Sequence, residues 1–225
     1  MNWNTVLFVI LPYVSIFVAI VATIYRTAYR PFSISSLSSQ LLERKKLYWG
    51  SIPFHWGISL ILFGHLLALL FPREFVVWNS VPLRLYLLEL TGFILALWML
   101  VGLIVLGLRR LTVARVRAVT SLMDVVVWTL LLVSVLTGIY TAVQYRFGSY
   151  WFTAIFTPYL WSILTFQPNA SLVQPFPLLI KVHVVNFFLL LFVFPFSRLV
   201  HIIAYPLGYL IRPWQIVIYP TWHKP

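Results

Sequence analysis

Residues 52–71 read IPFHWGISLILFGHLLALLF, and this stretch decides the class of fold. It contains no Lys, Arg, Asp or Glu, and about 20 apolar residues are enough to cross the hydrocarbon core of a bilayer. His55 and His65 lie near its two ends. The stretch therefore predicts a membrane helix that presents one imidazole at each of two depths.

Four more apolar stretches surround it in the chain, at residues 3–25, 83–108, 122–143 and 178–203. With 62% hydrophobic and only 9% charged residues, the composition excludes a soluble domain of this length. The first stretch lacks a basic leader and a small-residue cleavage site, so we expect it to remain as a helix. The sequence predicts an all-α membrane protein with five transmembrane helices in one domain, 1–225.

The basic residues predict an orientation, because short loops rich in Lys and Arg stay in the cytoplasm. Twelve of the sixteen basic residues fall on one side of this arrangement: Arg26, Arg30, Arg44, Lys45, Lys46, Arg109, Arg110, Arg115, Arg117, Arg198, Arg212 and Lys224. We therefore expect the N-terminus outside and the C-terminus in the cytoplasm, with the basic loops against anionic lipids. Charge dispersed over loops does not favour nucleic-acid binding.

This topology predicts how the histidines pair. The second and fifth helices run in opposite directions, so His65 and His183 share the outer depth and His55 and His201 share the inner one. Eighteen residues make five helical turns, so we expect His183 and His201 on one face of the fifth helix. That interval rises about 27 Å, against about 15 Å between His55 and His65, and we expect a kink at Pro195 to reduce the difference.

Paired imidazoles within a membrane favour haem over other metal centres. The chain has no Cys and only four acidic residues, which excludes thiolate sites and covalent haem attachment and argues against carboxylate-rich sites. A lone intramembrane His is usually a hydrogen-bonding residue between helices, but four at matching depths predict two bis-imidazole haems. Gly57 and Gly64 are expected to leave room for the macrocycles, or to serve helix packing. His223, near the end of the chain, is expected to be solvated or interfacial.

Several stretches then resemble a known family, the gamma subunit (cytochrome b) of respiratory nitrate reductase. The resemblance covers nearly the whole chain and rests on the histidine spacings and on these segments: SSQLLERK (38–45), FHWG (54–57) with Gly64-His65, Arg109-Arg110-Leu111 with RVRA (115–118), and FPFSRL (194–199) before His201.

The resemblance implies a membrane subunit that oxidises quinol near the outer face and passes electrons inward through two b haems. His65 and His183 would hold the distal haem, and His55 and His201 the proximal one. An iron-sulfur beta subunit would then pass the electrons to a molybdenum-containing alpha subunit that reduces nitrate. Arginines at the cytoplasmic end would be possible contacts for haem propionates: Arg109, Arg110, Arg115, Arg117 and Arg198.

A quinol site near the distal haem needs a proton acceptor and a hydrogen-bond donor. On the outer side the candidates are Arg84, Tyr86, Glu89 and Lys181, with Gly64 lining the pocket. The family is expected to have a lysine where this chain has Tyr86.

Two other functional interpretations of the sequence stay open. A dihaem quinone-linked anchor could serve a different respiratory enzyme, acting on sulfur compounds, heterodisulfide or formate, because the haem architecture does not encode the terminal acceptor. Alternatively, the chain could be a haem-free transporter whose histidines relay protons.

Overall fold

The structure is a computed structural model that describes residues 3–30, 33–34 and 37–203. Its regular elements are all helical, and five of the helices are long and apolar enough to cross a membrane. The first, Trp3–Tyr29, joins α1 (Trp3–Thr5), η1 (Val6–Ile10) and α2 (Leu11–Tyr29). The next three are α3 (Lys45–Leu70), α5 (Pro82–Thr112) and α7 (Leu122–Gln144). The fifth, Leu178–Phe196, joins α10 (Leu178–Val193) and η5 (Phe194–Phe196). The prediction of an all-α protein with five such helices is confirmed.

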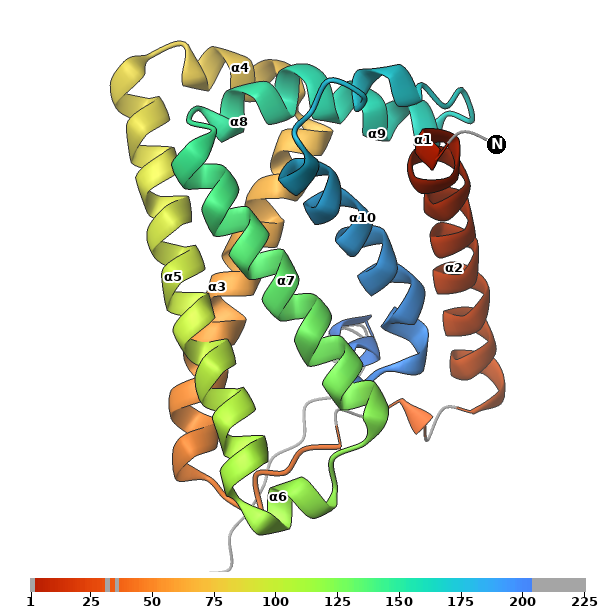
Figure 1. The fold of residues 1–225 in the computed structure, drawn as a ribbon, viewed down its shortest axis with the longest axis vertical. Helices are drawn as coiled ribbons and strands as arrows, with labels where there is room; N and C mark the ends of the chain where they lie inside the picture. Colours follow the sequence, from red (N-terminus) through yellow and green to blue (C-terminus); the bar gives the residue numbers. More distant parts are fainter. Residues whose placement is uncertain (1–2, 31–32, 35–36, 204–225) are drawn as a thin grey trace, which may run out of the picture.

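The short elements gather at the two ends of the bundle (Figure 1). One end carries α4 (Pro72–Asn79), α8 (Gly148–Trp151), η3 (Phe152–Phe156) and α9 (Thr157–Leu164), beside the N-terminal α1. The opposite end carries α6 (Ala114–Ala118) and the start of α3. His223 and the rest of the C-terminal tail lie outside the described residues.

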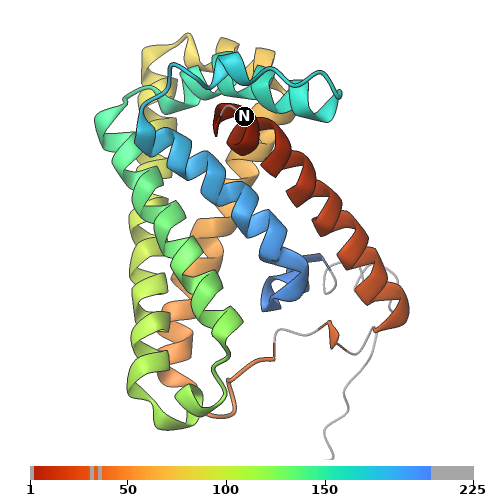
Figure 2. The same ribbon diagram turned by 45° about the vertical axis from the view of Figure 1, so that its right-hand side comes forward.

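The helices form two packing groups. In the first, α3 packs along α5, and α5 packs against α7, around Phe54, Leu103 and Val135. In the second, α10 packs against α2, and both views show α2 on the far side of α10 from α5 (Figures 1 and 2). Contacts between α7 and α10 join the groups. The helix that carries His55 and His65, α3, and the helix that carries His183, α10, therefore belong to different groups.

Close approach of α3 and α5 depends on glycine. A Cβ atom added at Gly102 would lie 2.6 Å from the backbone nitrogen of Phe54 and 2.7 Å from the carbonyl oxygen of Gly50. A Cβ atom at Gly57 would lie 2.7 Å from that of Met99. Gly57 therefore serves helix packing, as small residues do between membrane helices, and the alternative that it makes room for a macrocycle is wrong.

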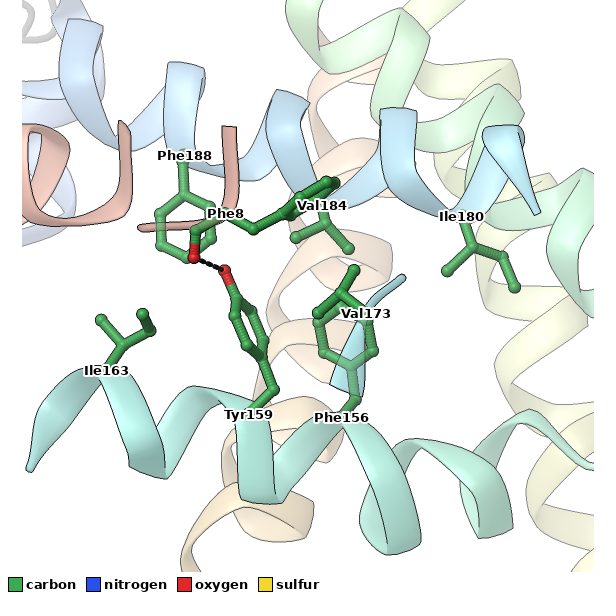
Figure 3. Close-up of a cluster of buried hydrophobic side chains, with 8 residues drawn as sticks. All are labelled: Phe8, Phe156, Tyr159, Ile163, Val173, Ile180, Val184 and Phe188. Atoms are coloured by element: carbon green, nitrogen blue, oxygen red, sulfur yellow. Dashed lines mark hydrogen bonds between the residues drawn. The ribbon is translucent and has the colours of Figure 1, made fainter. Parts of the chain in front are cut away.

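A second core joins the N-terminal helix to the end of the bundle (Figure 3). Pro12 has no N–H, so it cannot donate to the carbonyl of Phe8, four residues earlier. The phenol of Tyr159, on α9, donates to that carbonyl at 2.9 Å, and neither residue is more than 1% exposed. Phe156, Val184 and Phe188 pack around this pair.

The segment between the fourth and fifth long helices contains short helical elements. They are α8, η3, α9 and η4 (Ala170–Leu172). Pro158 lies within the first turn of α9, where a missing N–H costs nothing. The aromatic side chains of this segment pack on α10 and on the N-terminal helix, which stabilises helical turns that are too short to persist alone.

The fifth long helix ends earlier than the sequence predicts, and this is a correction. It was predicted to run to residue 203, but α10 ends at Val193 and is followed by two 3₁₀ turns, η5 and η6 (Arg198–Val200). Pro195 lacks the N–H that an α-helix requires, and Ser197 between the two turns has extended backbone. The guanidinium of Arg26, on α2, donates to the carbonyl of Pro195 and holds this corner.

Candidate functional site

The histidines lie in two groups along α3. His55 lies in the first half of this helix, and its ring centre is 6.2 Å from that of His201, which follows η6. His65, ten residues further along α3, lies close enough to His183 of α10 for electrostatic interaction. The structure thus brings together the residues that the topology argument paired, although His201 reaches His55 from a 3₁₀ corner and not from the face of a continuous helix.

The four imidazoles share one hydrogen-bonding feature: each uses Nδ1 within the protein. His55 contacts the carbonyl of Ser51 at 2.8 Å, His65 that of Ile61 at 2.8 Å, and His201 that of Arg198 at 2.6 Å. A carbonyl oxygen can only accept, so Nδ1 carries the proton in these three rings. In a neutral ring Nε2 is then the nitrogen with a free lone pair, which is the form that binds a metal.

His183 differs in its partner. Its Nδ1 lies 2.9 Å from the hydroxyl oxygen of Thr137, on α7. A Cβ atom at Gly138, the next residue, would lie 3.3 Å from Cε1 of the same ring. Sequence reasoning missed both α7 residues, because no spacing rule relates them to a histidine that lies 46 positions after Thr137.

The spacing of His55 and His201 fits an iron held between two imidazoles. With metal–nitrogen bonds of about 2 Å, two rings on opposite sides of one metal have centres roughly 6 Å apart, as these do. The rings of His55 and His65 are exposed, and a Cβ atom at Gly64 would meet nothing within 4 Å. Among the described residues no group of three or more His, Cys, Asp or Glu side chains could hold a metal.

The arginines at the His55 end form ion pairs within the protein. Arg109 is 3% exposed and pairs with Glu43, Nε to Oε2 2.7 Å, while also donating to Ser39. Arg110 and Arg198 both pair with Asp124, at 3.2 and 2.7 Å. Propionate contact by these three residues stays a prediction. Arg115 and Arg117 are exposed.

Sequence reasoning used Glu43 and Asp124 only to argue against carboxylate chemistry, and so missed their structural role. Asp124 also completes a capping box with Ser121 at the start of α7. The spacing Ser-x-x-Asp before an apolar run is a signal that could have identified this helix start.

The quinol-site candidates lie at the His65 end, around the turn between α7 and α8. Glu89 accepts a hydrogen bond from the backbone N–H of Ser149 at 2.7 Å, and the Tyr86 ring lies 6.2 Å from that of Phe147. The ring of His65 contacts Phe152, three residues after Ser149, at 5.1 Å between centres. Arg84 and Lys181 have other partners: Arg84 lies over the ring of Trp78, and Lys181 donates to the carbonyl of Gln174.

Comparison with known proteins decides the family. Residues 4–220 match the family model described as the nitrate reductase gamma subunit. The chain belongs to the nitrate reductase gamma subunit family. The gamma subunit resemblance drawn from the sequence segments is thereby confirmed.

Two relatives of this gamma subunit match it over nearly their whole length. It is 32% identical to the nitrate reductase gamma chain of Bacillus subtilis over 94% of this chain and 96% of the relative. It is 31% identical to the respiratory nitrate reductase 1 gamma chain of Escherichia coli over 95% and 96% of the two chains. A nitrate reductase-like protein of Mycobacterium tuberculosis is 30% identical over 92% of this chain, which spans 32% of that relative. This gamma subunit is thus a multi-pass membrane subunit of an oxidoreductase complex.

Proposed function

We propose that this chain is the quinol-oxidising, dihaem cytochrome b subunit of a nitrate reductase in the cytoplasmic membrane. The main support for this proposal is the pair His55 and His201. Their ring centres are 6.2 Å apart, and both Nδ1 atoms donate to carbonyls. These residues hold the proximal haem b, and His65 and His183 hold the distal haem b. The haems supply one-electron carriers that alternate between ferric and ferrous iron.

The chain's own residues hold the ligands in the form that binds metal. With Nδ1–H bound to a carbonyl or hydroxyl, each ring is fixed in its tautomer and cannot rotate freely. His55 and His65 lie on α3, which packs with α5 and α7, while His183 lies on α10, which packs against α2. The glycine contacts of α3 with α5 then keep His55 and His65 at a fixed separation along one rigid helix.

Quinol oxidation belongs at the His65 end. Each quinol releases two protons and two electrons as it becomes quinone, and the protons need an acceptor within hydrogen-bonding reach. Tyr86 and Glu89, on α5 beside the turn before α8, are the candidates for this contact, with Arg84, Lys181 and the open position at Gly64. The electrons leave at the His55 end, toward an iron-sulfur beta subunit and a molybdenum-containing alpha subunit that reduces nitrate.

The distribution of basic residues supports the direction of this path. Arg109, Arg110 and Arg198 lie at the end that carries His55 and α6, which the positive-inside tendency assigns to the cytoplasm. The N-terminus lies at the other end of the bundle (Figure 1) and is then outside. Protons from quinol are released there, while nitrate reduction consumes protons in the cytoplasm.

The first test is the haem content of the purified membrane complex. We expect two haems b per chain in a pyridine haemochrome spectrum measured against protein concentration. A complex without haem b would overturn the proposal and would leave a haem-free role, such as transport or assembly. A partner subunit without nitrate reductase activity would instead indicate a different terminal acceptor.

Histidine variants test the assignment of each pair. His65→Ala or His183→Ala should each lose one haem and quinol-driven nitrate reduction, while a soluble reductant that acts directly on the partner subunits still supports turnover. His55→Ala or His201→Ala should lose the other haem and the electron path to the partners. His223→Ala is the control and should retain both haems. Retention of both haems by any of the first four variants would contradict the pairing.

A further inference from the structure

Three of the four imidazoles are held by carbonyls close by in the chain. The acceptors for His55 and His65 lie four residues earlier on α3, and that of His201 lies three residues earlier in η6. His183 is the exception, because its Nδ1 contacts a side-chain hydroxyl on another helix, that of Thr137. The main-chain carbonyl of Ser134, on the same helix, also interacts with this ring, but the contact at 2.9 Å is the one with the hydroxyl.

The proton arrangement in this contact follows from the other neighbours of the hydroxyl. The Thr137 oxygen lies 2.6 Å from the carbonyl oxygen of Val133 and 3.2 Å from that of Ser134. Both carbonyls can only accept, so the single hydroxyl proton points toward them. The hydroxyl then faces His183 with a lone pair, and Nδ1 is the donor. Thr137 thus gives His183 the same tautomer that the carbonyls give the other three rings.

The surroundings keep this contact in one geometry. The Thr137 side chain is 7% exposed, so water has little access to replace it. Asn186, one turn after His183 on α10, donates to the carbonyl of Leu130 at 2.8 Å and to Ser134 at 2.6 Å, which fixes α10 against α7. Gly138 allows the ring to lie against α7, since a Cβ atom there would lie 3.3 Å from Cε1.

We propose that Thr137 is the positioning residue of the distal haem: its hydroxyl orients His183 and sets how strongly that imidazole donates electrons to the iron. This inference rests on the proposed function, in which His183 is a haem ligand. An acceptor on Nδ1–H makes an imidazole more basic and so favours ferric iron. Thr137 lies on α7, which supplies no haem ligand, so α7 influences the midpoint potential of the distal haem through this residue.

The test is a redox titration of the purified complex, followed optically and by the electron paramagnetic resonance of the two ferric haems. Thr137→Val keeps the shape of the side chain but removes the hydroxyl acceptor, and leaves the Ser134 carbonyl in place. We expect the midpoint potential of the distal haem alone to rise, and its retention to weaken by about 10- to 100-fold, the usual effect of removing such a partner. Thr137→Ser, which keeps the hydroxyl, should restore the wild-type potential.

Thr141→Val is the matched control. Thr141 lies one turn further along α7, and its hydroxyl is buried without a hydrogen-bond partner, so the same change of hydroxyl to methyl should leave both potentials unchanged. His183→Ala identifies which signal belongs to the distal haem, because that signal disappears.

The outcomes separate this inference from the proposed function. A Thr137→Val complex with two haems and a distal potential that is unchanged or lower would overturn the role of Thr137 and leave the dihaem assignment intact. An equal rise of the distal potential in the Thr141→Val complex would also overturn the role of Thr137, because it would show a general effect of α7 packing. A wild-type complex without haem would overturn both proposals.

Discussion

Asp124 and Arg198 form an ion pair, Oδ1 to Nε 2.7 Å, that ties the first turn of α7 to the 3₁₀ turn before His201. The same arginine accepts from His201 Nδ1 through its carbonyl and donates to the carbonyls of Leu37 and Val119. Asp124 also pairs with Arg110. One carboxylate therefore anchors the corner that brings His201 to His55.

Asp124→Asn should loosen this corner. The amide retains the shape of the carboxylate but leaves two neighbouring arginines without a negative partner, and hydrogen bonds to charged groups contribute about 1.5–3 kcal/mol. We expect a lower unfolding temperature of the detergent-solubilised complex and partial loss of the haem held by His55 and His201. The measurements are thermal unfolding and the ratio of haem to protein.

Ser121→Ala provides the control, because it removes the helix cap and leaves both ion pairs in place. Loss of a cap costs about 0.5–2 kcal/mol, so stability should fall while the proximal haem is retained. If both variants lost the haem equally, the helix start and not the Asp124–Arg198 pair would explain the effect.

Tyr159→Phe should destabilise the end of the bundle that carries α9. The Phe8 carbonyl would lose its donor in a site without water access, at a cost of about 1–3 kcal/mol. Burial raises the pKa of Tyr159 above its ordinary value, so the phenol stays a donor under physiological conditions. Tyr13→Phe is the control, since that buried hydroxyl has no partner. Comparable unfolding temperatures for the two variants would contradict this account.

Glu43 should make stability depend on pH. Hydrogen bonds from the backbone N–H of Lys46, and then the Arg109 guanidinium, lower the pKa of this carboxyl below its ordinary value of 4.5. A lowered folded-state pKa means that the carboxylate stabilises the fold above pH 4.5, and that this contribution is lost as the pH falls from there through the lowered value. Thermal unfolding between pH 7 and 3 should show the decline in the wild type.

Glu43→Gln should remove that part of the decline and lower stability at neutral pH, because Arg109 is left buried without a counter-ion. Glu74→Gln, in the exposed first turn of α4, is the control and should retain the wild-type profile. A Glu43→Gln profile parallel to the wild type would show that this ion pair does not carry the acid sensitivity.

Gly102→Ala should disrupt the contact between α3 and α5, because the new Cβ atom would lie 2.6 Å from backbone nitrogen of Phe54. Overpacking of this kind costs about 1–3 kcal/mol and should reduce folded yield and unfolding temperature. Gly92→Ala, on the same helix with nothing within 4 Å of the new atom, should be neutral or stabilising. Equal effects of the two changes would refute close packing as the role of Gly102.

The histidine arrangement shows what the sequence could predict. Apolar length and the opposite directions of two helices are local and topological properties, and they were enough to place His55 near His201. The pairing of His65 with His183 as haem ligands stays a prediction. The same reasoning failed at Pro195, because it assumed a continuous helix. The helix ends there because proline lacks an N–H, and the corner beyond it depends on Arg26 and on Asp124, far away in the chain.

By itself, then, the sequence determined the helical membrane class, the approximate positions of five long helices and the proximity of His55 to His201. These features follow from hydrophobic length and helical rise, which depend only on residues near one another in the chain. Tertiary structure alone decided which side chains hold the imidazoles and arginines: Thr137 for His183, Glu43 for Arg109 and Asp124 for Arg198. Such partners lie tens of residues apart, and packing of whole helices brings them within hydrogen-bonding distance.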